Sequence, residues 1–302
     1  MKVDLHTHTR ASDGALTPRE LVDKAAEHRV DVLAVTDHDS TEGIAEASEA
    51  AARHRGLTLV PGLEINCNIE GAEIHVLGYL VDHQAPWFRE FLATQRAART
   101  ARVYTLAARL TEMGVPVDPA EVLALAGEAA PGRPHVAQVM VKHGYVRSVR
   151  EAFDKYLRSD GPANVPRHRL TPIEAIDVIR RAHGVAVLAH PGLANRDAMI
   201  PELVQAGLAG IETYYPEHSA GQIEAYLALC RRHGLVATGG SDYHGPHTGR
   251  AATLGSPHVP LEVWHALRQK ARELAPDAPE SQETHRPGES EPPPCRAGHP
   301  RA

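Results

Sequence analysis

The sequence predicts an α/β fold in which a parallel sheet closes into a barrel of strand–helix units and carries a helical insertion. Strand and helix patterns alternate over the first 80 residues, and the alternation resumes after residue 170. Residues 84–165 between them read almost entirely as helix. Repeated β-then-α units imply parallel strands, and six or seven such units favour a closed barrel over an open sheet. With 302 residues, the chain can bury a sizeable core.

The first half of the predicted barrel contains a helix with a recognisable start. Thr17 precedes Pro18, a residue favoured at the first helical position, so Thr17 is predicted to cap this helix. Strands are expected at Val3–Leu5, Val32–Thr36, Leu57–Val60, Leu63–Ile65 and Ile74–Leu80, and helices at Pro18–Arg29 and Thr41–His54.

The second half of the predicted barrel opens in the same way, with Thr171 before Pro172. A helix to about His183 is expected first, then strands at Val185–Ala189, Gly210–Thr213 and Leu235–Thr238, and a last helix from about Leu261. We therefore expect residues 1–83 and 166–272 to form the barrel and residues 84–165 to form an insertion that caps the substrate site. Residues 273–302 are expected to be a disordered tail, because the segment from Ala275 holds 7 of the chain's 23 prolines.

Composition excludes several classes of protein. The net charge of −6 argues against a protein that coats long nucleic acid, so no stable nucleic-acid complex is expected. No apolar run approaches the roughly 20 residues that span a bilayer, and no basic-then-apolar leader opens the chain. The three cysteines, Cys67, Cys230 and Cys295, are odd in number and far apart, which fits neither a disulfide framework nor a thiolate zinc site. We therefore expect a cytoplasmic protein.

Histidine is the unusual feature of the composition, with 20 residues. His6 and His8 end the first strand two residues apart, where alternate side chains of an extended chain point to the same side. Asp242 and His244 repeat this spacing near the end of the barrel series. Because the carboxyl ends of barrel strands converge on the face that holds active sites, we expect such residues to meet. The candidate ligands are His6, His8, Asp13, His38, Glu64, His75, His190, Asp242 and His244.

The number of candidate ligands predicts how many ions they hold. One catalytic zinc uses about three protein ligands, so nine candidates indicate two or three divalent ions with a bridging carboxylate. Imidazole and carboxylate ligands suit Mn²⁺, Fe²⁺ and Zn²⁺ alike. Clustered divalent ions lower the pKa of bound water and clamp the attacking and leaving oxygens of an in-line displacement. A phosphate ester is therefore the expected substrate.

Four sequence motifs resemble those of the PHP (polymerase and histidinol phosphatase) family, over the chain to about residue 270. They are His6-Thr7-His8, Thr36-Asp37-His38, Leu188-Ala189-His190-Pro191 and Gly240-Ser241-Asp242-Tyr243-His244. The resemblance implies a distorted (β/α)₇ barrel with a trinuclear metal site. It also implies one ion held by His6, His8, Glu64 and Asp242, a second by Asp13, His38 and His244, and a third by Glu64, His75 and His190.

Within the family, the insertion and the Ala11–Gly14 turn look most like the stand-alone nucleoside 3′,5′-bisphosphate phosphatases and related members that trim RNA oligonucleotides from the 5′ end. Local matches lie at Gly132–His135 and Ala152–Leu157. Histidinol phosphatases of the family usually have His where Asp13 stands, and lack the insertion. This chain departs from many bisphosphatase relatives at Ser159–Asn164, where they carry Gly-Lys and then Tyr, so the resemblance leaves the exact nucleotide open.

The resemblance implies a phosphoesterase in which a metal-bound hydroxide attacks phosphorus in line with the leaving group. Arg133 and His135 lie in a turn before a predicted helix and are expected to bind a second phosphate, because Arg binds phosphate bidentately. Arg10 is a weaker candidate for substrate contact. Asp13 and His218 are the catalytic candidates, with His218 either a general acid or a hydrogen-bonded structural residue. The expected substrate is a small phosphorylated molecule, either a 3′,5′-bisphosphonucleotide or the 5′ end of a short oligoribonucleotide.

Three alternatives stay open. Arg96, Arg99, Arg102 and Arg109 lie along one helical sector and could steer an anion, but a solvated face is the preferred interpretation. The enzyme could act on another metabolite, such as histidinol phosphate. The chain could also be a non-catalytic metal-binding interaction module, although modules of that type are expected to have lost ligands, and all nine are present here.

Overall fold

Seven strands form one sheet in sequence order. The structure, a computed structural model, describes residues 1–69, 72–127, 131–158, 160–165, 170–246 and 252–275. They are β1 (Val3–Asp4), β2 (Val32–Val35), β3 (Thr58–Ile69), β4 (Ala72–Tyr79), β5 (Val185–Leu188), β6 (Gly210–Tyr214) and β7 (Val236–Gly239). The Leu5 N–H donates to the Gly239 carbonyl at 3.1 Å, which brings the end of β1 to the end of β7. The sheet is therefore a nearly closed barrel, and the predicted α/β barrel class is confirmed.

One strand breaks the parallel repeat. β1, β2 and β3 are parallel, as are β5, β6 and β7, but β4 is antiparallel to both β3 and β5. β3 is also one continuous strand through Pro61 and Gly62, where two strands were expected. Only two residues separate β3 from β4, and so short a connection can join antiparallel strands only.

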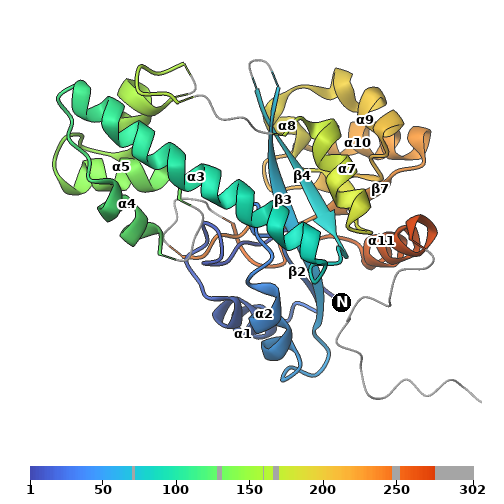
Figure 1. The fold of residues 1–302 in the computed structure, drawn as a ribbon. Coiled ribbons are helices and arrows are strands. Elements are labelled where there is room, and N and C mark those ends of the chain that lie inside the picture. Colours follow the sequence, from blue (N-terminus) through green and yellow to red (C-terminus); the bar gives the residue numbers. More distant parts are fainter. Residues whose placement is uncertain (70–71, 128–130, 159, 166–169, 247–251, 276–302) are drawn as a thin grey trace, which may run out of the picture.

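Helices cover the outside of the barrel (Figure 1). They are α1 (Pro18–Glu27), α2 (Ile44–Ala51), α7 (Pro172–Arg181), α8 (Pro191–Ala194), α9 (Ile200–Ala206), α10 (Ala220–His233) and α11 (Leu261–Leu274). The predicted cap of α1 is present: Thr17 Oγ1 accepts from the Glu20 N–H at 3.2 Å, and the Glu20 carboxylate accepts from the Thr17 N–H at 2.8 Å. None of the helices in the described ranges combines the length and apolar content that crossing a bilayer requires.

A long helix joins the barrel to the insertion. The insertion contains α3 (Pro86–Glu112), α4 (Pro119–Ala126), α5 (Arg133–Lys142), α6 (Val149–Ala152) and a π-helix (Phe153–Leu157). At its start, α3 packs Phe88 and Leu92 into an apolar cluster of the barrel, and further along it packs Leu106 and Leu110 into a separate cluster of the insertion. In Figure 1, α3 therefore reaches from β3 and β4 to α4 and α5. Ser159 of the departing segment, and the tail from residue 276, lie outside the described residues.

Candidate functional site

The predicted ligand side chains lie at one end of the barrel. His6 and His8 follow β1, His38 follows β2, His190 follows β5, and Asp242 and His244 follow β7, while Glu64 lies within β3. His75 lies near the start of β4 rather than at the end of a strand. Because β4 is antiparallel, its start is at the same end of the barrel as the ends of its neighbours.

The imidazoles of His6 and His8 lie beside two carboxylates. Their Nε2 atoms are 3.1 Å apart, and each lies 3.3 Å from Oε2 of Glu64. They lie 3.5 and 3.3 Å from Oδ1 of Asp242. Ligands about 2.1 Å from a tetrahedral ion are about 3.4 Å from one another. The distances from the two imidazoles to Glu64 and to Asp242 therefore match the spacing of metal ligands, with Glu64 and Asp242 in separate groups of ligand atoms.

A second group surrounds Asp13, which lies in the loop after β1. Oδ1 of Asp13 is 3.2 Å from Nε2 of His244 and 3.5 Å from Nδ1 of His8, and Oδ2 is 3.8 Å from Nε2 of His38. One ligand atom from each of these four residues lies within 4.8 Å of the others. The Asp13 side chain is 32% exposed, more than any other of the nine ligands, so this group faces open space.

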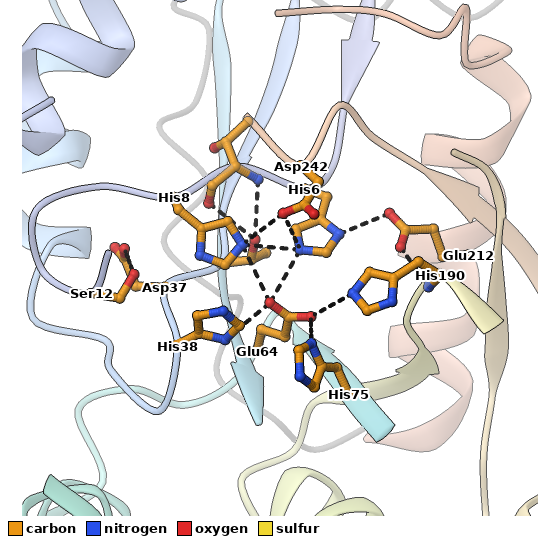
Figure 2. Close-up of polar contacts among 12 residues, drawn as sticks. His6, His8, Ser12, Asp37, His38, Glu64, His75, His190, Glu212 and Asp242 are labelled. Atoms are coloured by element: carbon orange, nitrogen blue, oxygen red, sulfur yellow. Dashed lines mark hydrogen bonds and ion pairs between the residues drawn. The ribbon is translucent and has the colours of Figure 1, made fainter. Parts of the chain in front are cut away.

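Glu64 is the carboxylate that connects the groups (Figure 2). Its Oε1 lies 2.8 Å from Nδ1 of His75 and 3.1 Å from Nε2 of His190, and its Oε2 lies 3.1 Å from Nδ1 of His38. With His6 and His8, five imidazoles surround this buried side chain. Both carboxylate oxygens therefore face ligand groups, as a bridging carboxylate requires.

The electrostatics of the site favour bound cations. Burial disfavours negative charge here, yet the surrounding imidazoles hold the pKa well below its ordinary value at three carboxyls, Asp13, Glu64 and Asp242. Burial alone would lower the pKa of His8 and His75, but neighbouring carboxylates raise it to about 9 and about 10. Burial lowers the pKa of His38 to about 3, which keeps that imidazole in the neutral form that binds metal. The buried negative charge is of the kind that divalent cations neutralise.

The donor atoms also fit divalent metal ions. Within the described part of the chain, Nδ1 of His8 and Nδ1 of His38 are buried and make no hydrogen bond, although carboxylate oxygens of Asp13 and Glu64 lie 3.5 and 3.1 Å from them. Buried polar atoms without a hydrogen bond are rare in folded proteins, so two such atoms beside carboxylates fit a site for a bound cation. Six imidazoles and three carboxylates without a thiolate are a ligand set that Mn²⁺, Fe²⁺ and Zn²⁺ accept.

Two buried carboxylates hold the loops that carry the ligands. Asp4 accepts hydrogen bonds from the Ser241 N–H at 2.9 Å and the Ser241 hydroxyl at 2.7 Å, which fixes the loop after β7 to β1. Asp37 accepts from the Thr9 N–H at 2.7 Å and from the Ser12 hydroxyl at 2.5 Å, which fixes the loop after β1. The ligands are therefore positioned before any ion binds.

Glu212 is a functional residue that the strand-end pattern does not indicate, because it lies within β6. It is fully buried, its Oε1 accepts from Nδ1 of His6 at 2.9 Å, and its Oε2 accepts from the His190 N–H at 2.8 Å. With the proton on Nδ1, the lone pair of Nε2 of His6 is available to bind a metal ion. A hydrogen bond of this kind from the other ring nitrogen is the usual support for a metal-binding imidazole. An acid inside an otherwise apolar strand is the signal that could have found it. Nearby, the Tyr215 hydroxyl donates to Oδ2 of Asp242 at 2.9 Å.

His218 is buried, and both of its ring nitrogens contact backbone. Nδ1 donates to the Thr213 carbonyl at 2.9 Å, and Nε2 accepts from the Gly192 N–H at 3.2 Å. Proton transfer to a leaving group would require one of these hydrogen bonds to break. The geometry therefore favours the structural alternative for His218 over a general acid.

A cavity of about 270 Å³, called the basic cavity below, opens between the ligand groups and the insertion. Its lining includes Asp13, His38 and His75 from the barrel, and Arg99, Arg102, Arg133 and His135 from the insertion. Arg133 donates to the Leu157 carbonyl at 3.0 Å and lies 3.6 Å from Oε2 of Glu73. Arg133 and His135 thus lie across this cavity from the ligands. Arg10 instead lines a separate cavity of about 470 Å³, with Asp13 and His135, and its Nε donates to the Ala15 carbonyl at 2.8 Å.

The arginines of α3 do not form a solvated face, so the preferred interpretation of this run is wrong. Arg96 contacts Glu42, Arg99 contacts Asp39, and Arg102 donates to the Val165 carbonyl at 2.9 Å. The side chains of Arg96 and Arg99 are only 27% and 13% exposed. The reason is that this sector of α3 faces the loops of the barrel and the end of the insertion instead of water.

Comparison with known proteins agrees with this geometry. The family model of the PHP domain matches residues 4–159. The Escherichia coli K12 5′-3′ exoribonuclease Rnm is 40% identical over 251 residues, which cover 80% of this chain and 85% of that protein. The Chromobacterium violaceum 3′,5′-nucleoside bisphosphate phosphatase is 34% identical over 291 residues, which cover 91% of this chain and 98% of that protein.

A solved structure supports the same assignment. A Bifidobacterium adolescentis protein, provisionally described as a metal-dependent phosphoesterase, matches with a TM-score of 0.78 and 31% identity, over 89% of this chain and 96% of that one. The sequence relatives, the matching family model and the shared fold agree, and the chain therefore belongs to the PHP domain family.

Proposed function

We propose that the chain is a metal-dependent phosphoesterase, a hydrolase that acts on small phosphorylated substrates. The observation that carries this proposal is the convergence of nine side chains, with Glu64 at their centre, at the spacing of metal ligands. Sites that gather several divalent ions between imidazoles and carboxylates are suited to displacement at phosphorus.

The proposed centre holds two or three divalent ions, Mn²⁺, Fe²⁺ or Zn²⁺. Following the family resemblance, the first would be held by His6, His8, Glu64 and Asp242, the second by Asp13, His38 and His244, and the third by Glu64, His75 and His190. The ligand atoms themselves cluster in overlapping groups, which include His6, His8 and Glu64, and also Asp13, His38 and His244 with His8. The distances from Glu64 to members of all three sets support a trinuclear arrangement in which this carboxylate bridges. We place the protein in the cytoplasm, because the two cysteines of the described residues, Cys67 and Cys230, are buried and form no disulfide there.

Residues of the chain would position the reacting groups. Divalent ions bound here would lower the pKa of a bound water molecule and would place positive charge beside the phosphate oxygens. Glu212 orients His6, and the Tyr215 hydroxyl orients Asp242, so both ligands keep one donor atom directed at the centre. Asp13 is the most exposed ligand and borders the basic cavity, which places its carboxylate where it can accept a proton from the attacking water.

The basic cavity supports a substrate with two phosphates. When one phosphate lies at the ligand groups, Arg133 and His135 lie across the cavity, where a neighbouring phosphate would be bound. We propose 3′,5′-bisphosphonucleotides or the 5′ ends of short oligoribonucleotides as substrates, in line with the activities for which the two relatives are named.

A hydrolysis assay with Mn²⁺ tests the proposal. Inorganic phosphate is measured for 3′,5′-bisphosphoadenosine, 3′-AMP and histidinol phosphate, and the released nucleoside 5′-phosphate is measured for 5′-phosphorylated oligoribonucleotides. Chelation and His6→Ala are each expected to abolish hydrolysis of every substrate, and activity that survives both would rule out the metal mechanism. A protein that binds no transition metal would support the non-catalytic alternative.

Arg133→Ala tests the second-phosphate contact. Loss of a charged hydrogen bond costs about 1.5–3 kcal/mol, so kcat/KM for the bisphosphate should fall roughly 10- to 100-fold, with far less change for 3′-AMP, which lacks the 5′-phosphate. An equal fall for both substrates would exclude the contact. Preferred hydrolysis of histidinol phosphate would support the metabolite alternative.

A further inference from the structure

A second cavity, about 260 Å³ in volume, adjoins the ligand groups and is called the apolar cavity here. It is lined by His75 and His190 together with apolar side chains such as Ile74, Leu193 and Met199. Glu73 and His75 line the basic cavity as well, so the two cavities meet beside the ligands. The apolar cavity is therefore open to the site in addition to the basic cavity and the cavity beside Arg10, and the proposed function uses only the basic one.

The apolar cavity has one cation in its lining, Arg196. Arg196 is exposed, and its guanidinium makes no hydrogen bond or ion pair within the described ranges. The arginines of the basic cavity, by contrast, are held by partners such as Asp39 and the Leu157 carbonyl. Arg196 is thus available to an external anion. Leu193, which is 47% exposed, brings an apolar surface to the same opening.

A phosphodiester substrate needs a place for the group on the far side of its phosphorus. When the 5′-phosphate of the first nucleoside lies at Arg133 and His135, the phosphorus on its O3′ lies at the ligand groups. The group esterified to that phosphorus can extend past His75 and His190, because the apolar cavity adjoins both. Bases of single strands bind through their flat apolar faces, and the following phosphate binds to arginine.

We propose that the apolar cavity receives the second nucleoside of a short oligoribonucleotide, and that Arg196 binds the phosphate that follows it; this rests on the proposed function. The size of the cavity agrees, because about 260 Å³ is below the ~300–1,000 Å³ of drug-sized pockets and suits one nucleoside unit.

The placement defines one reaction for both kinds of substrate. The oxygen of water bonds to phosphorus, the bond from phosphorus to O3′ of the first nucleoside breaks, and the proton that water loses ends on that O3′. An oligoribonucleotide yields a nucleoside 5′-phosphate and a chain one nucleotide shorter, whose new 5′-phosphate is the phosphate just attacked. A 3′,5′-bisphosphonucleotide undergoes the same exchange, leaves the apolar cavity unused, and yields inorganic phosphate.

The test compares kcat/KM for 3′,5′-bisphosphoadenosine, a 5′-phosphorylated diadenylate and a 5′-phosphorylated triadenylate. The diadenylate has a second nucleoside but no following phosphate, whereas the triadenylate has both. Arg196→Glu is therefore expected to lower kcat/KM at least ten-fold more for the triadenylate than for the other two substrates. Leu193→Ser is expected to lower kcat/KM for both oligonucleotides relative to the bisphosphate. Both side chains are exposed, so neither change disturbs the core.

Arg232→Glu on α10 is the matched control, because Arg232 is also exposed and lies outside the lining of the cavity. It should change the three values in equal proportion. If Arg196→Glu also lowers all three equally, or none of them, the inference is overturned while the proposed function stands. If wild-type protein hydrolyses none of the three, the proposed function fails and the inference fails with it.

Discussion

Replacing Glu212 by Gln tests whether the centre depends on the support behind its ligands. Both carboxylate oxygens accept hydrogen bonds, one from Nδ1 of His6 and the other from the His190 N–H. Gln has the same size but offers one acceptor and one donor, so its NH₂ group must face one of these two N–H groups. When it faces His6, the ring must accept at Nδ1 and carry its proton on Nε2, the atom that a metal needs bare.

The expected magnitude follows from this tautomer change. Loss of such support lowers metal affinity about 10- to 100-fold, equivalent to about 1.4–2.8 kcal/mol of binding free energy. We expect the dissociation constant of Glu212→Gln for Mn²⁺, measured by calorimetry on chelator-stripped protein, to rise by this factor. Saturating Mn²⁺ should then restore much of the phosphate release.

A matched variant separates this effect from a general change of charge. Glu224→Gln removes the same charge from an exposed position of α10 and should leave Mn²⁺ affinity unchanged. Equal Mn²⁺ affinity in wild type and Glu212→Gln would refute the reasoning. The urea midpoint of the metal-free variants shows whether the fold is intact.

Two further predictions concern packing and pH. A Cβ on Gly240 would clash with the backbone nitrogen of His6, so Gly240→Ala should cost about 1–3 kcal/mol of unfolding free energy in urea titrations and should weaken Mn²⁺ binding. A Cβ on Gly221 would meet nothing within 4 Å, so Gly221→Ala should change neither quantity. Against burial, carboxylates raise the pKa of His8 to about 9 and of His75 to about 10 in the metal-free fold. The stabilisation that these two protonated imidazoles give to the fold is complete below their pKa in the unfolded chain, near 6.5, and is lost as pH rises through 9–10. The Tm of chelated protein should therefore fall over that range. Mn²⁺-loaded protein should lack this fall, because the ions replace the protons; equal slopes would contradict the assignment.

The convergence of the nine candidate ligands could be predicted because position along the chain determines it. In parallel strands that follow one another, residues at successive strand ends meet at one end of the barrel. His6 and His38 are brought together in this way, and the spacing of Asp242 and His244 points both toward the same place. The local caps, such as Thr17, were predictable for a similar reason, since they depend only on residues within four positions.

Other features depend on contacts that the sequence pattern does not contain. The pattern of β4 has no direction, so its antiparallel course and the position of His75 near its start were not predictable. Glu212 contacts His6 across 206 positions of sequence. An acid within a strand marks Glu212 as unusual, but the sequence does not indicate that its partner is His6. The spacing along a helix shows which residues share a sector, but it does not show which other element packs on that sector. The burial of Arg99 against Asp39 was therefore not predictable.

The continuous course of α3 constrains the basic cavity. This helix has 27 residues, a length of about 40 Å at 1.5 Å per residue, and is anchored in apolar clusters near its start and toward its end. Widening the basic cavity would require the helix to bend or one of those clusters to separate. The barrel side and the insertion side of the basic cavity are therefore connected by one rigid element, and a change in the volume of this cavity would have to involve this helix or the apolar clusters that hold it. A substitution that loosens either cluster would then alter the cavity without touching any residue that lines it.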